Sequence, residues 1–210
     1  VQAARNFGDR VARVYSDPRA HVVIDDAKAY LSGSPMRYDV IVSEPSNPWV
    51  NGVATLFTEE FYDFVPKHLS ESGVFVQWLQ LYEINDELVA SVVRSLSLSF
   101  QDYRIYLSND GDMLIVARAD GPVGDLHAEL LASPRLEPEL KRIGIATTQD
   151  IVAHQIGSRR SLEPLVDALS ARATSDFHPT LSLKRRRHAS RRNRRRRSFA
   201  SPRRICRTAR

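Results

Sequence analysis

One segment of the chain carries residue types that could do acid–base chemistry at the end of a strand. An apolar run at positions 40–42 leads directly into Ser43-Glu-Pro-Ser-Asn-Pro-Trp49, which holds one carboxylate, Glu44. In open α/β sheets, ligands bind outside the carboxyl ends of the strands. A carboxylate in that position can bind a cation and accept its proton as a general base. The alternative is a solvated loop glutamate, but the strand-end position and the rigidity that Pro45 and Pro48 give the loop favour a role in a site.

Polar and aromatic neighbours of Glu44 could complete such a site. The hydroxyls of Ser43 and Ser46 can hydrogen-bond a ligand or the loop itself, and the loop role fits Ser46 better. Trp49 can form the wall of a pocket or cover a cation by cation–π contact. Packing of Trp49 against the following helix is an equally good interpretation.

The pattern of apolar residues predicts strands that alternate with helices. Apolar runs at positions 21–24, 38–42 and 74–79 are predicted to be strands. Two further strands, at 103–107 and 113–117, flank a turn sequence and are predicted to form a hairpin. Helices are expected over about 58–69, with a kink at Pro66, and after a capping Asn85. This alternation indicates an α/β fold, a parallel sheet with helices on both faces and a terminal antiparallel hairpin at or near its edge.

The remainder of the chain is divided into a helical segment and a basic tail. The sheet domain is predicted over residues 1–120, with short helical pieces packed on it over 125–183. Residues 184–210 contain fourteen Lys or Arg and no Asp or Glu, which leaves 16 basic and 25 acidic residues in 1–183. The acidic body does not favour nucleic acid as a partner, except through the tail, and it is compatible with a cationic ligand.

Composition excludes several classes of protein. The one cysteine, Cys206, excludes an internal disulfide and favours a reducing compartment, so a cytoplasmic location is predicted. No apolar run approaches the length of a membrane span. The lone histidine of Asp176-Phe-His-Pro179 has no partners at metal-ligand spacing, so we expect a structural turn there and no metal site.

Four motifs occur in order along the first 120 residues. They are Asp25-Asp-Ala27, the segment from Tyr38 to Pro48, Leu56-Phe-Thr-Glu-Glu-Phe-Tyr62 and Gly73-Val-Phe-Val-Gln-Trp-Leu79. Together they resemble the spermidine synthase family, the polyamine aminopropyltransferases with the Rossmann-like class I fold of S-adenosylmethionine-dependent methyltransferases. Residues 125–183 resemble the carboxyl part of bacterial spermidine synthase-like proteins.

The resemblance implies a role for each candidate site residue. Glu44 stands at the position of the family's catalytic aspartate. The attacking amine must be neutral, whereas an alkyl amine, with a pKa of about 10, is protonated at neutral pH. Asp26 and Ala27 are implied to recognise the adenine ring, with Ser43 among the adenosyl-binding residues. Asp26 can also cap the next helix, and the two roles can coexist.

The amine pocket is implied to lie along the same edge of the sheet. Its predicted members are Ser46, Asn47, Trp49, Gln80 and Glu83. Asn47 replaces a second acid that is usual in true spermidine synthases, which weakens the claim on a dicationic diamine. The expected partner is a small-molecule amine, and a homodimer is left open.

The resemblance also implies a partial sheet. The family's first strands, its glycine-rich nucleotide loop and its ribose-binding acid would precede Val1, so a copy truncated at its N-terminus is expected. The expected cofactor, consumed as a substrate, is S-adenosylmethionine or its decarboxylated form, without a metal. Two alternatives stay open: a methyltransferase of the same fold, which Asn47-Pro48-Trp49 loosely resembles, and an inactive fragment or non-catalytic binding module.

The Arg-rich tail has three interpretations. It can be an arm that binds an anionic surface, or a disordered end whose like charges repel one another. It can also be the product of a reading-frame slip, because GC-rich coding DNA read out of frame gives acid-free, Arg-rich sequence. The nucleotide sequence would distinguish a genuine tail from a frameshift product.

Overall fold

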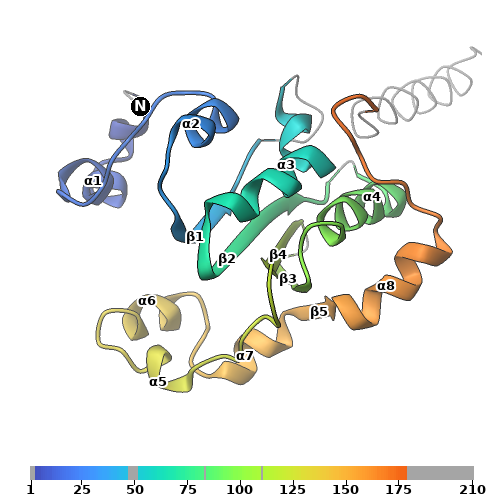
Figure 1. Ribbon diagram of the computed structural model, residues 1–210. Coiled ribbons are helices and arrows are strands. Elements are labelled where there is room, and N and C mark those ends of the chain that lie inside the picture. Colours follow the sequence, from blue (N-terminus) through green and yellow to red (C-terminus); the bar gives the residue numbers. More distant parts are fainter. Residues whose placement is uncertain (1–2, 47–51, 83, 110, 179–210) are drawn as a thin grey trace, which may run out of the picture. The chain divides into compact units, whose positions relative to one another are not determined.

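The computed structural model describes residues 3–46, 52–82, 84–109 and 111–178 (Figure 1). The chain divides into two compact units, Val1–Met36 and Arg37–Arg210, and each is described by itself. The Arg-rich tail at 184–210 lies outside the described residues.

The first unit is helical. It contains the 3-10 helix η1 (Ala3–Phe7) and the α-helices α1 (Asp9–Ser16) and α2 (Ala27–Gly33). The predicted strand at 21–24 is wrong, because this run is not a strand and Ile24 is 81% exposed. A strand needs a neighbouring strand to complete its backbone hydrogen bonds. None of the described strands pairs with this run, so its apolar residues stay exposed.

The second unit contains a five-stranded sheet in the order β1-β2-β4-β3-β5. Its strands are β1 (Tyr38–Ser43), β2 (Leu69–Gln80), β3 (Asp102–Asn109), β4 (Asp112–Arg118) and β5 (Gln155–Ser158). β1 and β2 are parallel, and the other neighbouring pairs are antiparallel. The α/β class and the β3–β4 hairpin near the edge are therefore confirmed. Among the described strands, the predicted parallel pairing is found only between β1 and β2.

A helical crossover connects the two parallel strands, as parallel pairing requires. It consists of η2 (Val53–Phe57), α3 (Glu59–Phe64) and η3 (Val65–His68). Pro66 lies in η3, so the α-helix ends just before it, which agrees with the predicted kink. The next helix, α4 (Asp86–Ser97), begins after Asn85, whose side chain accepts a hydrogen bond from the Leu88 amide at 3.0 Å. The predicted cap is confirmed.

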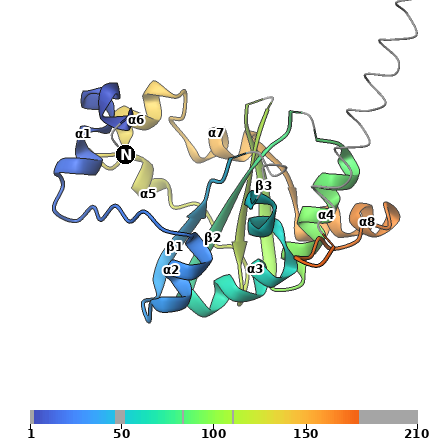
Figure 2. The ribbon, with the colours of Figure 1, turned by 90° about the horizontal axis from the view of Figure 1, so that it is seen from above.

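The hydrophobic core lies on one face of the sheet, where α3 and α4 pack (Figure 2). Alternate side chains of the central strands point into it because successive residues of a strand face opposite sides. The core residues of the strands are Phe75 and Leu79 in β2, Tyr103 and Ile105 in β3, and Met113, Ile115 and Ala117 in β4. Phe61 and Tyr62 of α3 and Val92 and Leu96 of α4 pack against them. The core thus fixes α3 against β2, the two elements beside the predicted site.

The chain after β4 is mostly helical but adds a strand to the sheet. It forms α5 (Ala128–Leu131), α6 (Glu137–Arg142), α7 (Thr148–Ala153), β5 and α8 (Arg159–Ala168). The helical prediction is wrong at Gln155 and Ile156, which lie in β5, the strand that pairs with β3 through Gln155, Gly157 and Ser158. Short strands depend on tertiary pairing more than on local propensity, and β3 offers a free edge here.

Candidate active site

The carboxyl ends of β1 and β2 form the edge that carries Glu44. β1 ends at Ser43, which pairs in register with Gln77, and β2 continues to Gln80. Glu44 follows β1 directly, is exposed and has no hydrogen-bond or ion-pair partner among the described residues. Ligands of α/β sheets bind at this kind of edge. An exposed carboxylate in this position can bind a cation and accept its proton.

The other predicted substrate residues are described only in part. Ser43 and Gln80 are half-buried at the ends of their strands, and Ser46 is exposed in the loop after β1. Gln80 pairs in register with Asp112 of β4, so it lies where β2 leaves the sheet. Three candidates lie outside the described residues: Asn47, Trp49 and Glu83.

The two predicted adenine-binding residues belong to the first unit. Asp26 is exposed and precedes α2, and its side chain accepts a hydrogen bond from the Ala29 amide at 3.0 Å. The capping role that the sequence allowed is therefore present. Ala27 is the exposed first residue of α2. Recognition of adenine by Asp26 and Ala27 stays a prediction.

One polar residue near the edge was not among the candidates. Gln77 of β2 is 0% exposed, although it lies at the strand end where we predicted an open pocket. Its position two residues from both Phe75 and Leu79 places it on the core face of the strand. The sequence indicated the burial of Gln77 through its spacing, because it alternates in step with two large apolar residues, Phe75 and Leu79.

The segment at 174–178 is anchored to the start of α3. Ser175 Oγ donates to Glu60 Oε1 at 2.5 Å, and the Asp176 amide donates to Glu60 Oε2 at 3.0 Å. Thr58 Oγ1 donates to Asp176 Oδ1 at 2.9 Å. The amide of His178 donates to the Ser175 carbonyl at 3.1 Å, which confirms the predicted turn. These contacts hold the start of α3, within the crossover between β1 and β2.

The hydrogen bonds from the 174–178 segment lower the pKa of the Glu60 carboxyl. Partial burial raises its pKa, but the hydrogen bonds from Ser175 and the Asp176 amide outweigh burial, so the pKa lies below its ordinary value of 4.5. A lowered folded-state pKa stabilises the fold above the unfolded-state pKa. That stability is lost as the pH falls through the folded-state value.

Glu60→Gln is expected to lower the free energy of unfolding by about 1.5–3 kcal/mol at neutral pH, because it removes hydrogen bonds to a charged acceptor. The loss should shrink as the pH falls below the ordinary value of 4.5 and the native carboxylate becomes protonated. Urea unfolding at several pH values measures both effects. Glu59→Gln, in the same first turn of α3, is the matched control for the helix dipole. An equal, pH-independent loss in both variants would contradict the anchor.

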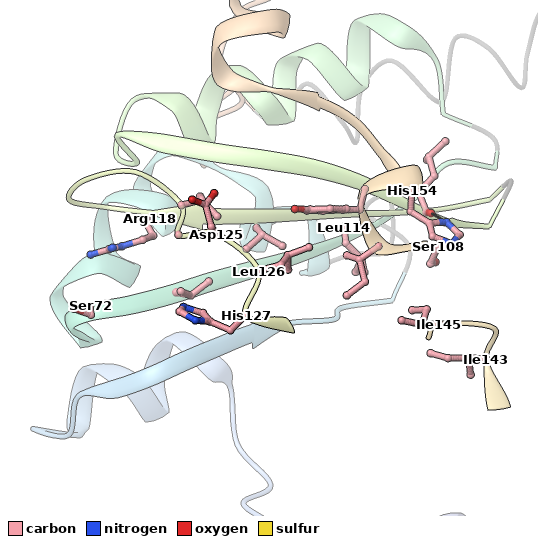
Figure 3. Close-up of a pocket in the computed structure, with 17 residues that line it drawn as sticks. Ser72, Ser108, Leu114, Arg118, Asp125, Leu126, His127, Ile143, Ile145 and His154 are labelled. Carbon is pink, nitrogen blue, oxygen red and sulfur yellow. Dashed lines mark hydrogen bonds between the residues drawn. The ribbon is translucent and has the colours of Figure 1, made fainter. Parts of the chain in front are cut away.

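A cavity of about 770 Å³ lies on the opposite face of the sheet from the core (Figure 3). Val74, Leu114 and Val116 line it, and these residues alternate with core residues along β2 and β4. In Figure 3, Arg118 and His127 lie toward one end and His154 toward the other. The volume suits a small ligand, but none of the predicted site residues is in the lining. The cavity is therefore separate from the Glu44 edge.

Metal sites and membrane-spanning helices are both absent from the described part of the chain. Among residues 3–46, 52–82, 84–109 and 111–178, no group of three or more His, Cys, Asp or Glu side chains is arranged to hold a metal ion. Within the same ranges, no helix has both the length and the apolar character to cross a membrane.

Comparisons with known proteins give one consistent family. Residues 1–109 match the family described as the spermine/spermidine synthase domain. The polyamine aminopropyltransferase of Bacillus subtilis is 30% identical over 109 residues, which cover 52% of this chain and 39% of that protein. The Synechococcus enzyme of the same name is 31% identical over 162 residues, or 74% of this chain and 47% of that protein. The chain thus spans about half or less of the length of these relatives.

Solved structures agree on the fold. A spermidine synthase in complex with the transition-state analogue AdoDATO has a TM-score of 0.61 at 24% identity, over 78% of this chain and 57% of that one. The spermidine synthase of Thermotoga maritima has a TM-score of 0.59 at 23% identity, over 78% and 56%. Likeness at this level of identity supports the fold alone.

The sheet and its helical crossover define an α/β fold, a class in which ligands bind beyond the carboxyl ends of the strands. The family match covers just over half of the chain, which is enough to assign the chain to a family within that class. The chain belongs to the spermine/spermidine synthase domain family, as its ordered motifs predicted.

Proposed function

We propose that this chain takes part in transfer of an aminopropyl group from decarboxylated S-adenosylmethionine to a small-molecule amine, a step of polyamine biosynthesis. The observation that carries the proposal is Glu44, an exposed carboxylate directly after β1, within the residues that match the family. The relatives named as polyamine aminopropyltransferases support the reaction type.

The proposed step exchanges one bond at carbon. The amine nitrogen attacks the aminopropyl carbon next to the sulfonium, a carbon–nitrogen bond forms, and the carbon–sulfur bond breaks with its electron pair going to sulfur. The sulfonium thereby becomes a neutral thioether. The attacking nitrogen must lose a proton, and Glu44 binds the ammonium and accepts that proton. A carboxylate is suited to both tasks because it is anionic and accepts hydrogen bonds through both oxygens.

The remaining predicted residues have proposed roles around this step. Asp26 and Ala27 would hold the adenine ring, and Ser43 would contact the adenosyl substrate. The amine would lie among Ser46, Asn47, Trp49, Gln80 and Glu83. A spermidine synthase of similar fold binds AdoDATO, which supports an adenosyl-type substrate here. The homodimer and the cytoplasmic location stay predictions.

Calorimetry with the two adenosyl compounds, followed by a turnover assay, tests the proposal. We expect the protein to bind decarboxylated S-adenosylmethionine more tightly than S-adenosylmethionine and to form spermidine from putrescine. Preference for S-adenosylmethionine together with a methylated product would instead assign a methyltransferase. If the protein binds neither compound, the chain is a non-catalytic module and the proposed function is wrong.

A further inference from the structure

The side chain of Gln77 is a fully buried amide that the proposed transfer step does not use. It lies on the core face of β2 and is 0% exposed. Burial of an amide is unfavourable unless hydrogen bonds replace those lost to water. The partners of Gln77 therefore show why a polar residue is tolerated in this core.

Both donor hydrogens of the amide are directed at backbone carbonyl groups. Gln77 Nε2 lies 2.9 Å from the carbonyl oxygen of Trp78 and 3.3 Å from that of Ser43. Gln77 Oε1 accepts a hydrogen bond from the hydroxyl of Tyr62 at 3.4 Å. Rotating the amide by half a turn would place its oxygen against two carbonyl oxygens, so the chemistry of the neighbours fixes its orientation.

Tyr62 connects this amide to the crossover helix. It belongs to α3, is 0% exposed, and its ring lies edge-on to Phe75 at 6.0 Å between centroids. Its burial also raises the pKa of its hydroxyl far above the ordinary value, so it stays a neutral donor. Gln77 thus bridges α3 and the end of β1 through the core.

The hydrogen bond to Ser43 acts on the peptide group that leads to Glu44. Ser43 is the last residue of β1 and pairs in register with Gln77. Its carbonyl shares a planar peptide unit with the amide nitrogen of Glu44. Holding this oxygen therefore orients the peptide plane from which the Glu44 Cα and side chain extend.

We propose that Gln77 is a positioning residue for Glu44. Its buried amide holds the Ser43–Glu44 peptide and so directs the carboxylate outward at the edge of the sheet. The proposal rests on the proposed function for its catalytic consequence, but its structural part can be measured without turnover. A small misplacement of a catalytic group is costly, because the rate depends on the geometry of attack.

Gln77→Met tests the proposal, because methionine keeps the length of the side chain but has no amide. In ¹⁵N relaxation, the order parameter of the Glu44 backbone amide should fall from about 0.85 in the native protein toward about 0.6. Ser95→Ala is the control. Ser95 is also 0% exposed and hydrogen-bonded, to the Ser91 carbonyl at 2.9 Å and the Thr174 amide at 2.8 Å, but not to β1. The Ser95→Ala substitution should leave the order parameter of the Glu44 amide unchanged.

Kinetics add a test that a merely structural role would not pass. Gln77→Met should lower kcat about 10- to 100-fold, with a smaller change in the KM for the amine. The same substitution in a Glu44→Gln background should cause almost no further loss, because the group that it positions is absent. Additive losses, or an unchanged order parameter at Glu44, would overturn the proposal. If the native protein transfers no aminopropyl group, the proposed function fails, and the order parameter still decides the positioning role.

Discussion

Glu44→Gln is expected to reduce the rate of aminopropyl transfer by about 10²- to 10⁴-fold, the usual contribution of a general base. Glutamine keeps the size of the side chain but has no negative charge and no affinity for a proton at neutral pH. The attacking amine would then stay protonated, since the pKa of an alkyl amine is about 10. Because Glu44 is exposed, the substitution should leave the free energy of unfolding within about 0.5 kcal/mol of the native value.

The measurement is kcat with putrescine and decarboxylated S-adenosylmethionine across a range of pH. Raising the pH should recover part of the activity of the glutamine variant, because more of the amine is neutral in solution. Glu71→Gln, at an exposed position near the start of β2, is the matched control and should keep native activity. Native-like turnover by Glu44→Gln would show that another group removes the proton.

The parts of the fold that the sequence predicted are those encoded by local patterns. The strands at 38–42 and 74–79 are apolar runs with turn residues on both sides, and both are present in β1 and β2. The β3–β4 hairpin was evident from its turn sequence, and the cap at Asn85 from its side chain. Each of these signals arises within a few residues, so no tertiary information was needed.

The two wrong predictions concern segments whose structure depends on distant parts of the chain. Residues 21–24 are as apolar as a strand, yet an apolar run becomes a strand only beside a partner. Gln155–Ser158 is too short to be evident as a strand, and it forms one because the edge of β3 is available. Pairing between distant segments decides both cases, and the sequence of either segment alone does not contain it.

In the candidate site too, some residues could be placed from the local sequence and others could not. The position of Glu44 followed from the strand that precedes it, and the structure places it directly after β1. Gln77 was not among the candidates, and the phase of β2 turns its side chain into the core. The burial of Gln77 could be predicted from its spacing of two residues from Phe75 and Leu79, which places all three side chains on one face of the strand. A polar side chain on a buried face is normally hydrogen-bonded inside the protein.

Phe75→Ala is expected to have the largest effect on stability, about 3–5 kcal/mol. Phe75 is 0% exposed at the centre of the sheet, and its ring stacks on Phe100 at 5.3 Å between centroids and meets Tyr62 and Phe61 edge-on. Removing it leaves a cavity among the rings of Phe61 and Tyr62 in α3 and of Phe100, which lies between α4 and β3. Such a loss is a large share of the roughly 5–15 kcal/mol that stabilises a typical domain.

Urea unfolding of Phe75→Ala and Phe177→Ala compares the free energy of unfolding after the same ring is removed from a buried and from an exposed position. Both substitutions delete the same ring, but Phe177 is 85% exposed and should cost no more than about 0.5 kcal/mol. The unfolding slope should be unchanged in both variants if the transition stays two-state. The same comparison bears on the candidate site, because Phe75 packs against Tyr62, which bonds Gln77. A loss below about 1 kcal/mol for Phe75→Ala would mean that this aromatic cluster does not hold α3 on β2, and the bridge from α3 to the end of β1 would lose its support.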